Sequence, residues 1–163
     1  MKPNVGRVIC GGCVATPAMT VFMYTLAPAM GVQLDIAAML GSMLGGWKMG
    51  MLLHIMNGVI LFPLIYALLL YRFFAGSPLA KGIGFGVSLW LLSQLVVMPL
   101  MGAGLFSSNI GGTMAVLASL FGHIVYGGLL GLLGGPAEES SPEQSVRTPH
   151  TTGASKPEYS GRM

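Results

Sequence analysis

Four long apolar runs constrain this chain more than any other feature. They cover residues 8–26, 47–74, 80–100 and 113–135, and few charged side chains interrupt them. A helix of about 20 apolar residues is long enough to cross the hydrocarbon core of a bilayer. Only 8% of the 163 residues are charged, against about 25% in a soluble domain. The sequence therefore predicts an all-α membrane protein, with four transmembrane helices in one domain over residues 1–135 and the lipid bilayer as its partner.

The segments between the runs carry residues that begin or end helices. Asp35 is a good N-cap for a short helix over residues 36–44, which Gly45 and Gly46 would end. Because this helix is too short to span a bilayer, we expect it to lie at the membrane interface. Pro17 has no backbone N–H, and it predicts a kink in the first transmembrane helix.

The composition changes at residue 136. Residues 136–163 are rich in Pro, Ser, Thr, Glu and Gly, which predicts a disordered tail. Lys and Arg mark the cytoplasmic flanks of transmembrane helices. Only Lys48 opposes the basic residues that fall on one side of the predicted membrane: Lys2, Arg7, Arg72, Lys81, Arg147 and Lys156. We therefore expect both termini in the cytoplasm and residues 28–46 and 102–112 on the other side. The basic residues are too scattered for a nucleic-acid interface.

Two pairs of short matches indicate an internal repeat. Pro28 and Gly31 recur 71 residues later as Pro99 and Gly102, while His54 and Gly58 recur 69 residues later as His123 and Gly127. Units of two helices each insert the same way round, so the matches predict two parallel two-helix repeats over residues 5–74 and 79–135. Chance similarity in a sequence rich in Gly, Met and Leu is the alternative.

His54 and His123 are the main candidate functional residues. Both lie inside apolar runs, where an ionisable side chain costs at least a few kcal/mol unless it has a partner or a function. Each has a glycine four residues later, Gly58 or Gly127, on the same helix face. These glycines permit close approach, either by another helix or by a flat ligand.

Three interpretations of the histidine pair stay open at this point. In the first, the two imidazoles ligate a haem b between the second and fourth helices, as in other helical bundles. In the second, they are core residues hydrogen-bonded to Asn57, Ser93, Gln94 or backbone carbonyls, which clamp the bundle. This reading is favoured because not every polar residue within a membrane marks a functional site. The third reading is quinone, proton or ion handling. Tyr126, in the same motif as His123, is a further polar candidate.

Three other features carry weaker chemical signals. Asp35 is the only acidic residue before the tail; a cap is favoured for it over a one-carboxylate transport site. Cys10 and Cys13 share a helix face, as a metal or redox pair would, but helix packing is favoured. Thioether pairs at i, i+4, namely Met19/Met23 and Met39/Met43, suit Cu(I), although filling an irregular core is the commoner role.

The stretch from Leu34 to Gly46, followed by His54-Ile-Met-Asn-Gly58 and Tyr66, resembles a group of small bacterial membrane proteins of unknown function. The group includes the YagU-like inner-membrane proteins, and the resemblance covers residues 5–135. It implies a four-span fold in the bacterial inner membrane, and it carries over no catalytic residues.

The favoured function is an accessory or structural membrane protein. One form of that role is a small subunit of a respiratory complex that binds haem or quinone at His54 and His123. The alternative is a small transporter or channel for a proton, metal ion or small solute. A transporter would need to be a homo-oligomer, because four helices enclose little volume. The sequence has no paired carboxylates and no H-E-x-x-H motif, so a non-enzymatic role is favoured.

Overall fold

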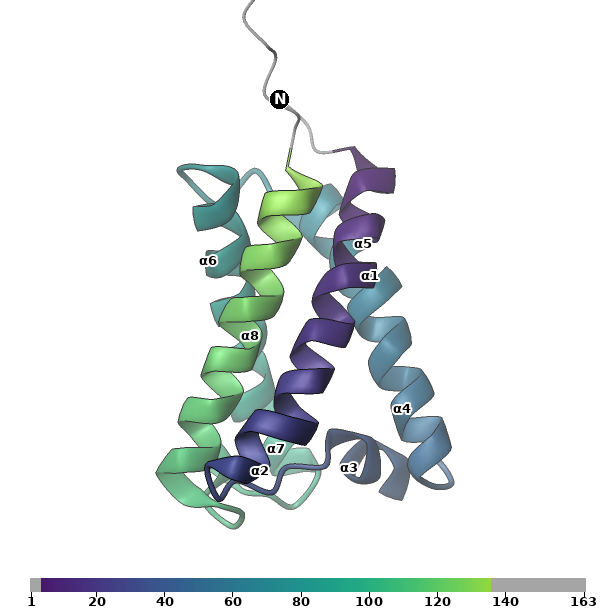
Figure 1. Cartoon of the computed structure of the whole chain (residues 1–163), viewed down its shortest axis with the longest axis vertical. Coiled ribbons are helices and arrows are strands. Elements are labelled where there is room, and N and C mark those ends of the chain that lie inside the picture. Colours follow the sequence, from purple (N-terminus) through teal and green to yellow (C-terminus); the bar gives the residue numbers. More distant parts are fainter. Residues whose placement is uncertain (1–3, 136–163) are drawn as a thin grey trace, which may run out of the picture.

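The computed structural model describes residues 4–135 as a bundle of four helical spans (Figure 1). The first span is formed by α1 (Val5–Val21), the π-helical η1 (Phe22–Leu26) and α2 (Ala27–Ala29). The second is formed by α4 (Trp47–Met56), η2 (Asn57–Leu61), α5 (Phe62–Ile65) and η3 (Tyr66–Leu70). The third is formed by α6 (Pro78–Leu92), η4 (Ser93–Val97) and α7 (Met98–Leu100), and the fourth by α8 (Gly112–Gly134).

All four spans are long and apolar enough to cross a membrane, which confirms a multi-pass, all-helical membrane protein. Among residues 4–135 there is no strand. Arg7, Arg72 and Lys81 lie near one end of the bundle, while Lys48 lies near the other, where α3 is found (Figure 1). Which end faces the cytoplasm stays a prediction, and the predicted tail lies outside the described residues.

The second span ends earlier than expected. Helix geometry stops at Leu70 instead of residue 74, and Tyr71 to Phe73 form a turn. The reason lies in the side chain of Tyr71, which folds back into the bundle and is only 7% exposed. Its ring packs edge-on against Tyr66, and the Lys81 ammonium lies 4.1 Å from the ring centroid. Burial raises the pKa of Tyr71 above its ordinary value.

The short helix is α3 (Ile36–Ser42), and Asp35 caps it as predicted. The Asp35 carboxylate accepts a hydrogen bond from the Ala38 N–H at 2.9 Å. Gly45 and Gly46 follow with positive φ, which glycine adopts without strain. The helix packs closely on α4, because a Cβ at Gly50 would run into the Ala37 backbone. Its place at a membrane interface stays a prediction.

Prolines follow three of the four π-helical segments within residues 4–135, all but η3. Three π-helical segments, η1, η2 and η4, each end two residues before a proline: Pro28, Pro63 and Pro99. Proline has no N–H and clashes with the carbonyl four residues earlier. The helix widens there, so the N–H just before the proline bonds five residues back instead of four. By contrast, α1 stays α-helical through Pro17, where the sequence predicted a kink.

The two predicted repeat units end their first helices in the same way. The N–H groups of Gly31 and Gly102 bond the carbonyls of Pro28 and Pro99, and both glycines have φ near +80° (80° and 77°). The two turns therefore share a local structure. It does not extend to the next segment, since α3 follows the first turn while a short 3₁₀ turn (Leu105–Ser107) follows the second. The duplication of whole units stays a prediction.

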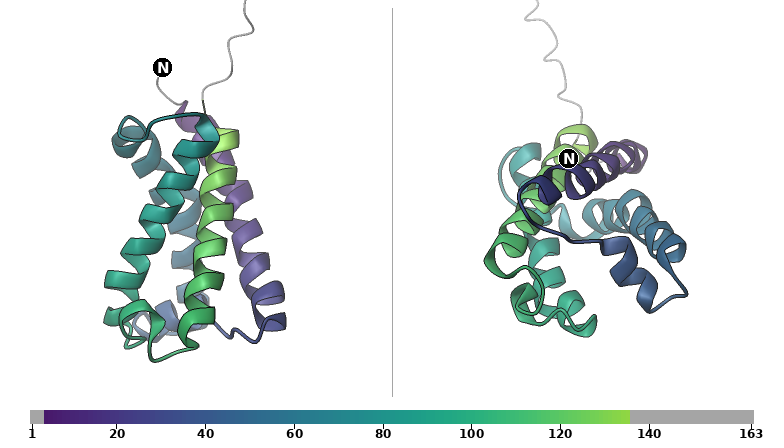
Figure 2. Two further views of the ribbon diagram at one scale, coloured as in Figure 1. Left: turned by 90° about the vertical axis from the view of Figure 1, so that its left-hand side faces the viewer. Right: turned by 60° about the horizontal axis from the view of Figure 1, so that its bottom comes forward.

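Glycines determine how closely the helices approach. In both orientations the fourth span lies between the third and the first, with α6 and α1 packed along α8 (Figure 2). At the α6–α8 contact, a Cβ at Gly127 would lie 2.8 Å from the Gly86 backbone, and Gly82 and Gly131 meet in the same way. The sequence predicted that Gly127 permits close approach either by another helix or by a flat ligand. The structure has close approach by a helix at this position.

Candidate functional site

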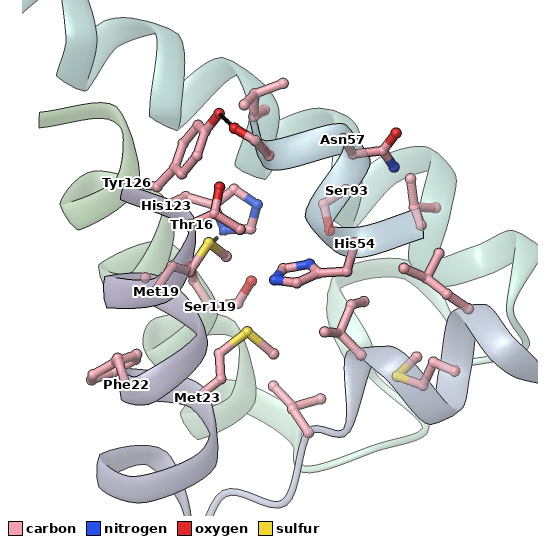
Figure 3. A pocket seen from close by; sticks show the side chains of 18 of the residues that line it. Thr16, Met19, Phe22, Met23, His54, Asn57, Ser93, Ser119, His123 and Tyr126 are labelled. Carbon is pink, nitrogen blue, oxygen red and sulfur yellow. Dashed lines mark hydrogen bonds between the residues drawn. The ribbon is translucent and has the colours of Figure 1, made fainter. Parts of the chain in front are cut away.

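His54 and His123 lie far apart in the sequence but line one pocket inside the bundle. The pocket has a volume of about 200 Å³ and is bounded by α1, α3, α4, the α6–η4 helix and α8. Figure 3 shows both imidazoles directed into this space, together with Thr16, Ser119 and Tyr126. Most of the remaining lining is apolar: Phe22, Leu34, Phe62, Leu89, Leu92 and Met98.

His54 is held by the first span. Its Nε2 lies 3.0 Å from the Thr20 hydroxyl, and that hydroxyl donates to the Thr16 carbonyl at 2.8 Å. A threonine hydroxyl has one hydrogen. Because the carbonyl takes that hydrogen, the Nε2 of His54 carries its own proton and donates to Thr20. A neutral His54 then leaves Nδ1 as a bare acceptor.

His123 is held by its own helix. Its Nδ1 lies 2.8 Å from the Ser119 carbonyl one turn earlier. A carbonyl only accepts hydrogen bonds, so Nδ1 carries the proton and Nε2 of the neutral ring is a bare acceptor. The predicted backbone-carbonyl partner is therefore confirmed for His123. This bond stays within α8 and does not join two helices.

The side-chain partners predicted for the histidines are wrong, because none of them bonds an imidazole among the described residues. Gln94 is fully buried, but it donates to Ser119 and accepts from the Ser107 hydroxyl at 3.0 Å. Asn57 borders the pocket without a hydrogen bond to either imidazole among the described residues. The partner that sequence reasoning missed is Thr20. A polar face of Thr16 and Thr20, four residues apart in an apolar run, is the signal that could have indicated it.

Tyr126 joins the fourth span to the second. Its buried hydroxyl donates to the Gly58 carbonyl at 2.7 Å, drawn as a dashed line in Figure 3. This carbonyl is available because of Pro63. The Phe62 N–H bonds Asn57 instead, and Pro63 has no N–H to offer. Gly58 is thus both a helix contact, against Thr16, and the acceptor for Tyr126.

Thr16 supplies an unused polar atom at the pocket wall. Its side chain is only 3% exposed, and its hydroxyl has no hydrogen-bond partner among the described residues. A buried hydroxyl without a partner costs roughly 1–3 kcal/mol. The atom lies where a Cβ at Gly58 would be, so it belongs to the contact between α1 and η2.

Asp35 lies outside the pocket, in a cluster that fixes α3. It accepts hydrogen bonds from the Tyr24 hydroxyl and, at 3.1 Å, from the Trp47 indole. Burial alone would raise the pKa of Asp35, but the bonds from Tyr24, Ala38 and Trp47 hold it below its ordinary value of 3.8. All of these contacts are structural, in keeping with the favoured capping role.

The sulfur residues separate into two groups. Cys10 and Cys13 are exposed on the outer surface of α1, away from the pocket. Met19, Met23 and Met39 line the pocket. Residues 4–135 contain no group of three or more His, Cys, Asp or Glu side chains placed to hold a metal ion.

Comparison with known proteins places most of the chain in a protein family. The profile of a family described as "Family of unknown function (DUF6789)" matches residues 3–144 of the chain. No curated protein and no solved structure matches it at a significant level. A relation to the YagU-like proteins and a bacterial origin stay predictions.

Proposed function

Because the chain belongs to this family of unknown function, DUF6789, we propose its role from the pocket: a membrane-embedded binding protein for a quinol-type ligand. Such a ligand is a small apolar ring that carries hydroxyl groups. The observation that carries the proposal is a largely apolar pocket with two imidazoles whose free nitrogens are acceptors.

The size and walls of the pocket suit a single substituted ring. An apolar cavity of about 150 Å³ in another protein holds benzene, and this pocket measures about 200 Å³. Its walls are aliphatic, aromatic and thioether side chains, which favour an apolar ring over a hydrated ion or sugar.

The polar atoms select the hydroquinone over the quinone. Nε2 of His123 and Nδ1 of His54 are both acceptors in the tautomers that their partners impose. A quinol offers two hydroxyl donors to such acceptors. A quinone offers only carbonyl acceptors, which neither bare imidazole nitrogen can bind, so it would depend on the other polar side chains of the lining, Asn57, Ser93 and Ser119.

The pocket is placed to receive a ligand from the bilayer. Leu92 belongs to its wall and is also 51% exposed on the outside of the bundle. The wall at this point therefore separates the pocket from the lipid by one side chain. An apolar ligand dissolved in the membrane needs no water-filled route to reach it.

Haem fits this arrangement less well than a quinol does. A pair of axial imidazoles needs a bare Nε2 on each ring, whereas Nε2 of His54 is engaged with Thr20. The volume of about 200 Å³ is below the 300–1,000 Å³ of pockets for drug-sized ligands. Gly127 gives no room for a macrocycle, because the α6 backbone occupies the space beside it.

The test is ligand binding to the detergent-purified full chain under anaerobic conditions. Thermal unfolding is followed with a short-chain benzoquinol, with its quinone, and with neither. We expect the quinol to raise Tm and the quinone to do so much less. His123→Leu should weaken quinol binding about tenfold, the equivalent of one hydrogen bond, while Met114→Leu, at a 56% exposed position of the same helix, should not.

Equal binding of quinol and quinone, or unchanged quinol affinity in His123→Leu, would contradict the proposal. A dithionite-reduced minus oxidised spectrum separates it from haem binding. A sharp α band that both His54→Ala and His123→Ala abolish would establish the haem alternative. Membership of a respiratory complex, and transport of a solute, stay predictions that this assay does not address.

A further inference from the structure

Two thioether sulfurs share the pocket with the two imidazoles. Met19 and Met23 lie one turn apart on the first span, and both line the pocket with His54 and His123. Figure 3 shows their sulfur atoms on the pocket side of α1, toward the imidazoles. We propose that Met19, Met23, His54 and His123 form a binding site for Cu(I), a use of the pocket beyond quinol binding.

The donor set matches a soft, monovalent ion. Thioether sulfur and imidazole nitrogen are ligands that Cu(I) accepts, whereas Mg²⁺ and Ca²⁺ take oxygen ligands. All four side chains are neutral, and the only carboxylate among residues 4–135, Asp35, does not line the pocket. A single positive charge is less costly to hold in such surroundings than a double one.

The imidazoles are already in a state that can bind a metal. A metal takes the bare nitrogen of a neutral imidazole, while the other N–H donates to a fixed acceptor that orients the ring. His123 has this arrangement, with Nδ1 bonded to the Ser119 carbonyl and Nε2 bare. In His54 the two ring nitrogens exchange these roles: Nε2 is bonded to Thr20 and Nδ1 is bare.

The methionines are held close to the imidazoles without being locked in place. A Cβ at Gly122 would lie 3.6 Å from both Cγ and Cε of Met19. The Met19 side chain therefore packs on α8 at Gly122, the residue before His123. Methionine has three rotatable bonds, which allow the sulfurs to close on an ion without backbone movement.

The inference and the proposed function share His123 but differ in their use of the methionines. A quinol contacts Met19 and Met23 only as apolar wall, and leucine provides the same wall at nearly the same volume. Cu(I) needs the sulfur atoms, which leucine lacks. Replacing both methionines by leucine therefore separates the two ligands.

The experiment is anaerobic Cu(I) titration of the full chain in detergent, with bicinchoninate as the competing chelator. The background is Cys10→Ser with Cys13→Ser, because two exposed thiols would bind Cu(I) themselves. We expect one Cu(I) for each chain in this background. Met19→Leu with Met23→Leu should weaken binding at least 100-fold, while Met114→Leu, at a 56% exposed position on α8, should leave it unchanged.

The proposal is overturned if removal of the cysteines abolishes Cu(I) binding, or if the double leucine variant binds Cu(I) as the parent does. It is also overturned if the double leucine variant loses the quinol-induced rise in Tm, since the pocket itself would then be damaged. Retained quinol binding with lost Cu(I) binding supports it. Cu(I) binding that persists although no quinol binds would leave the metal site standing and refute the proposed function alone.

Discussion

The hydrogen bond between Tyr126 and Gly58 gives the sharpest test of how this bundle is held together. Tyr126→Phe removes one hydroxyl from a side chain that is 3% exposed and leaves the ring in place. The Gly58 carbonyl then has no donor, because Phe62 bonds elsewhere and Pro63 has none. Tyr66→Phe is the matched control, because the Tyr66 hydroxyl is equally buried and has no partner among the described residues.

The expected magnitude follows from the geometry. Leaving a buried acceptor unsatisfied costs about 1–3 kcal/mol, and hydrogen bonds between membrane helices measure about 0.6 kcal/mol on average with a maximum near 1.7. We therefore expect Tyr126→Phe to lower the free energy of unfolding by about 1–2 kcal/mol. Tyr66→Phe should leave it unchanged or raise it, since it removes a hydroxyl that was buried without a partner.

The assay is unfolding in mixed micelles at increasing mole fraction of sodium dodecyl sulfate, followed by circular dichroism. Thermal unfolding provides a second readout, in which 1 kcal/mol corresponds to about 2–4 °C for a chain of this size. Pro63→Ala extends the test, because alanine supplies the N–H that proline lacks. In that background Gly58 has a donor within its own helix, and Tyr126→Phe should cost less, with a coupling energy of at least about 0.5 kcal/mol.

Equal losses of stability in Tyr126→Phe and Tyr66→Phe would refute the reasoning. Both losses of stability would then result from removing an oxygen atom from the core, and neither would result from breaking a specific hydrogen bond. A loss from Tyr126→Phe that is the same with and without Pro63 would refute the role given to the proline.

Three further outcomes follow from the same structure. Gly127→Ala should destabilise the protein strongly, because the new Cβ would meet the α6 backbone. Gly128→Ala should be neutral or stabilising, since the nearest neighbours of its Cβ would be side-chain atoms at 3.5 and 3.8 Å. Thermal unfolding of both variants checks this. The lowered pKa of Asp35 stabilises the fold above its ordinary value of 3.8, so stability should fall as the pH drops below that value. Asp35→Asn should flatten this part of the pH profile. Thr20→Val should free Nε2 of His54 and shift the ¹⁵N resonances of that ring, while those of His123 stay unchanged.

The sequence alone was sufficient for the features that depend on neighbours along the chain. Four spans follow from the length and apolar composition of the runs, because backbone groups in lipid must be paired within a helix. The cap at Asp35 is local in the same sense, although α3 ends at Ser42, two residues before the predicted end, and the positive-φ Gly45 and Gly46 follow a turn. The π-helical segments before Pro28, Pro63 and Pro99 follow a local rule as well, because each proline lacks the N–H that the carbonyl four residues earlier would accept.

The sequence also placed His54 and His123 at a candidate site, and the structure brings them to one pocket. It could not assign their partners. Thr20 is 34 residues from His54, and Tyr126 is 68 residues from its acceptor Gly58. Contacts of that separation depend on the rotation of each helix about its axis. In an apolar span the hydropathy pattern leaves that rotation undetermined, since lipid and protein interior are equally apolar.

Tertiary structure alone decided the roles of the glycines and the methionines. Gly58 and Gly127 occupy equivalent places in the two His-Gly motifs, yet one meets a threonine side chain and the other meets a helix backbone. Met19 and Met43 are alike in sequence context, but only the first lines the pocket. Spacing along a helix fixes which residues share a face, whereas packing against the other helices fixes what that face contacts.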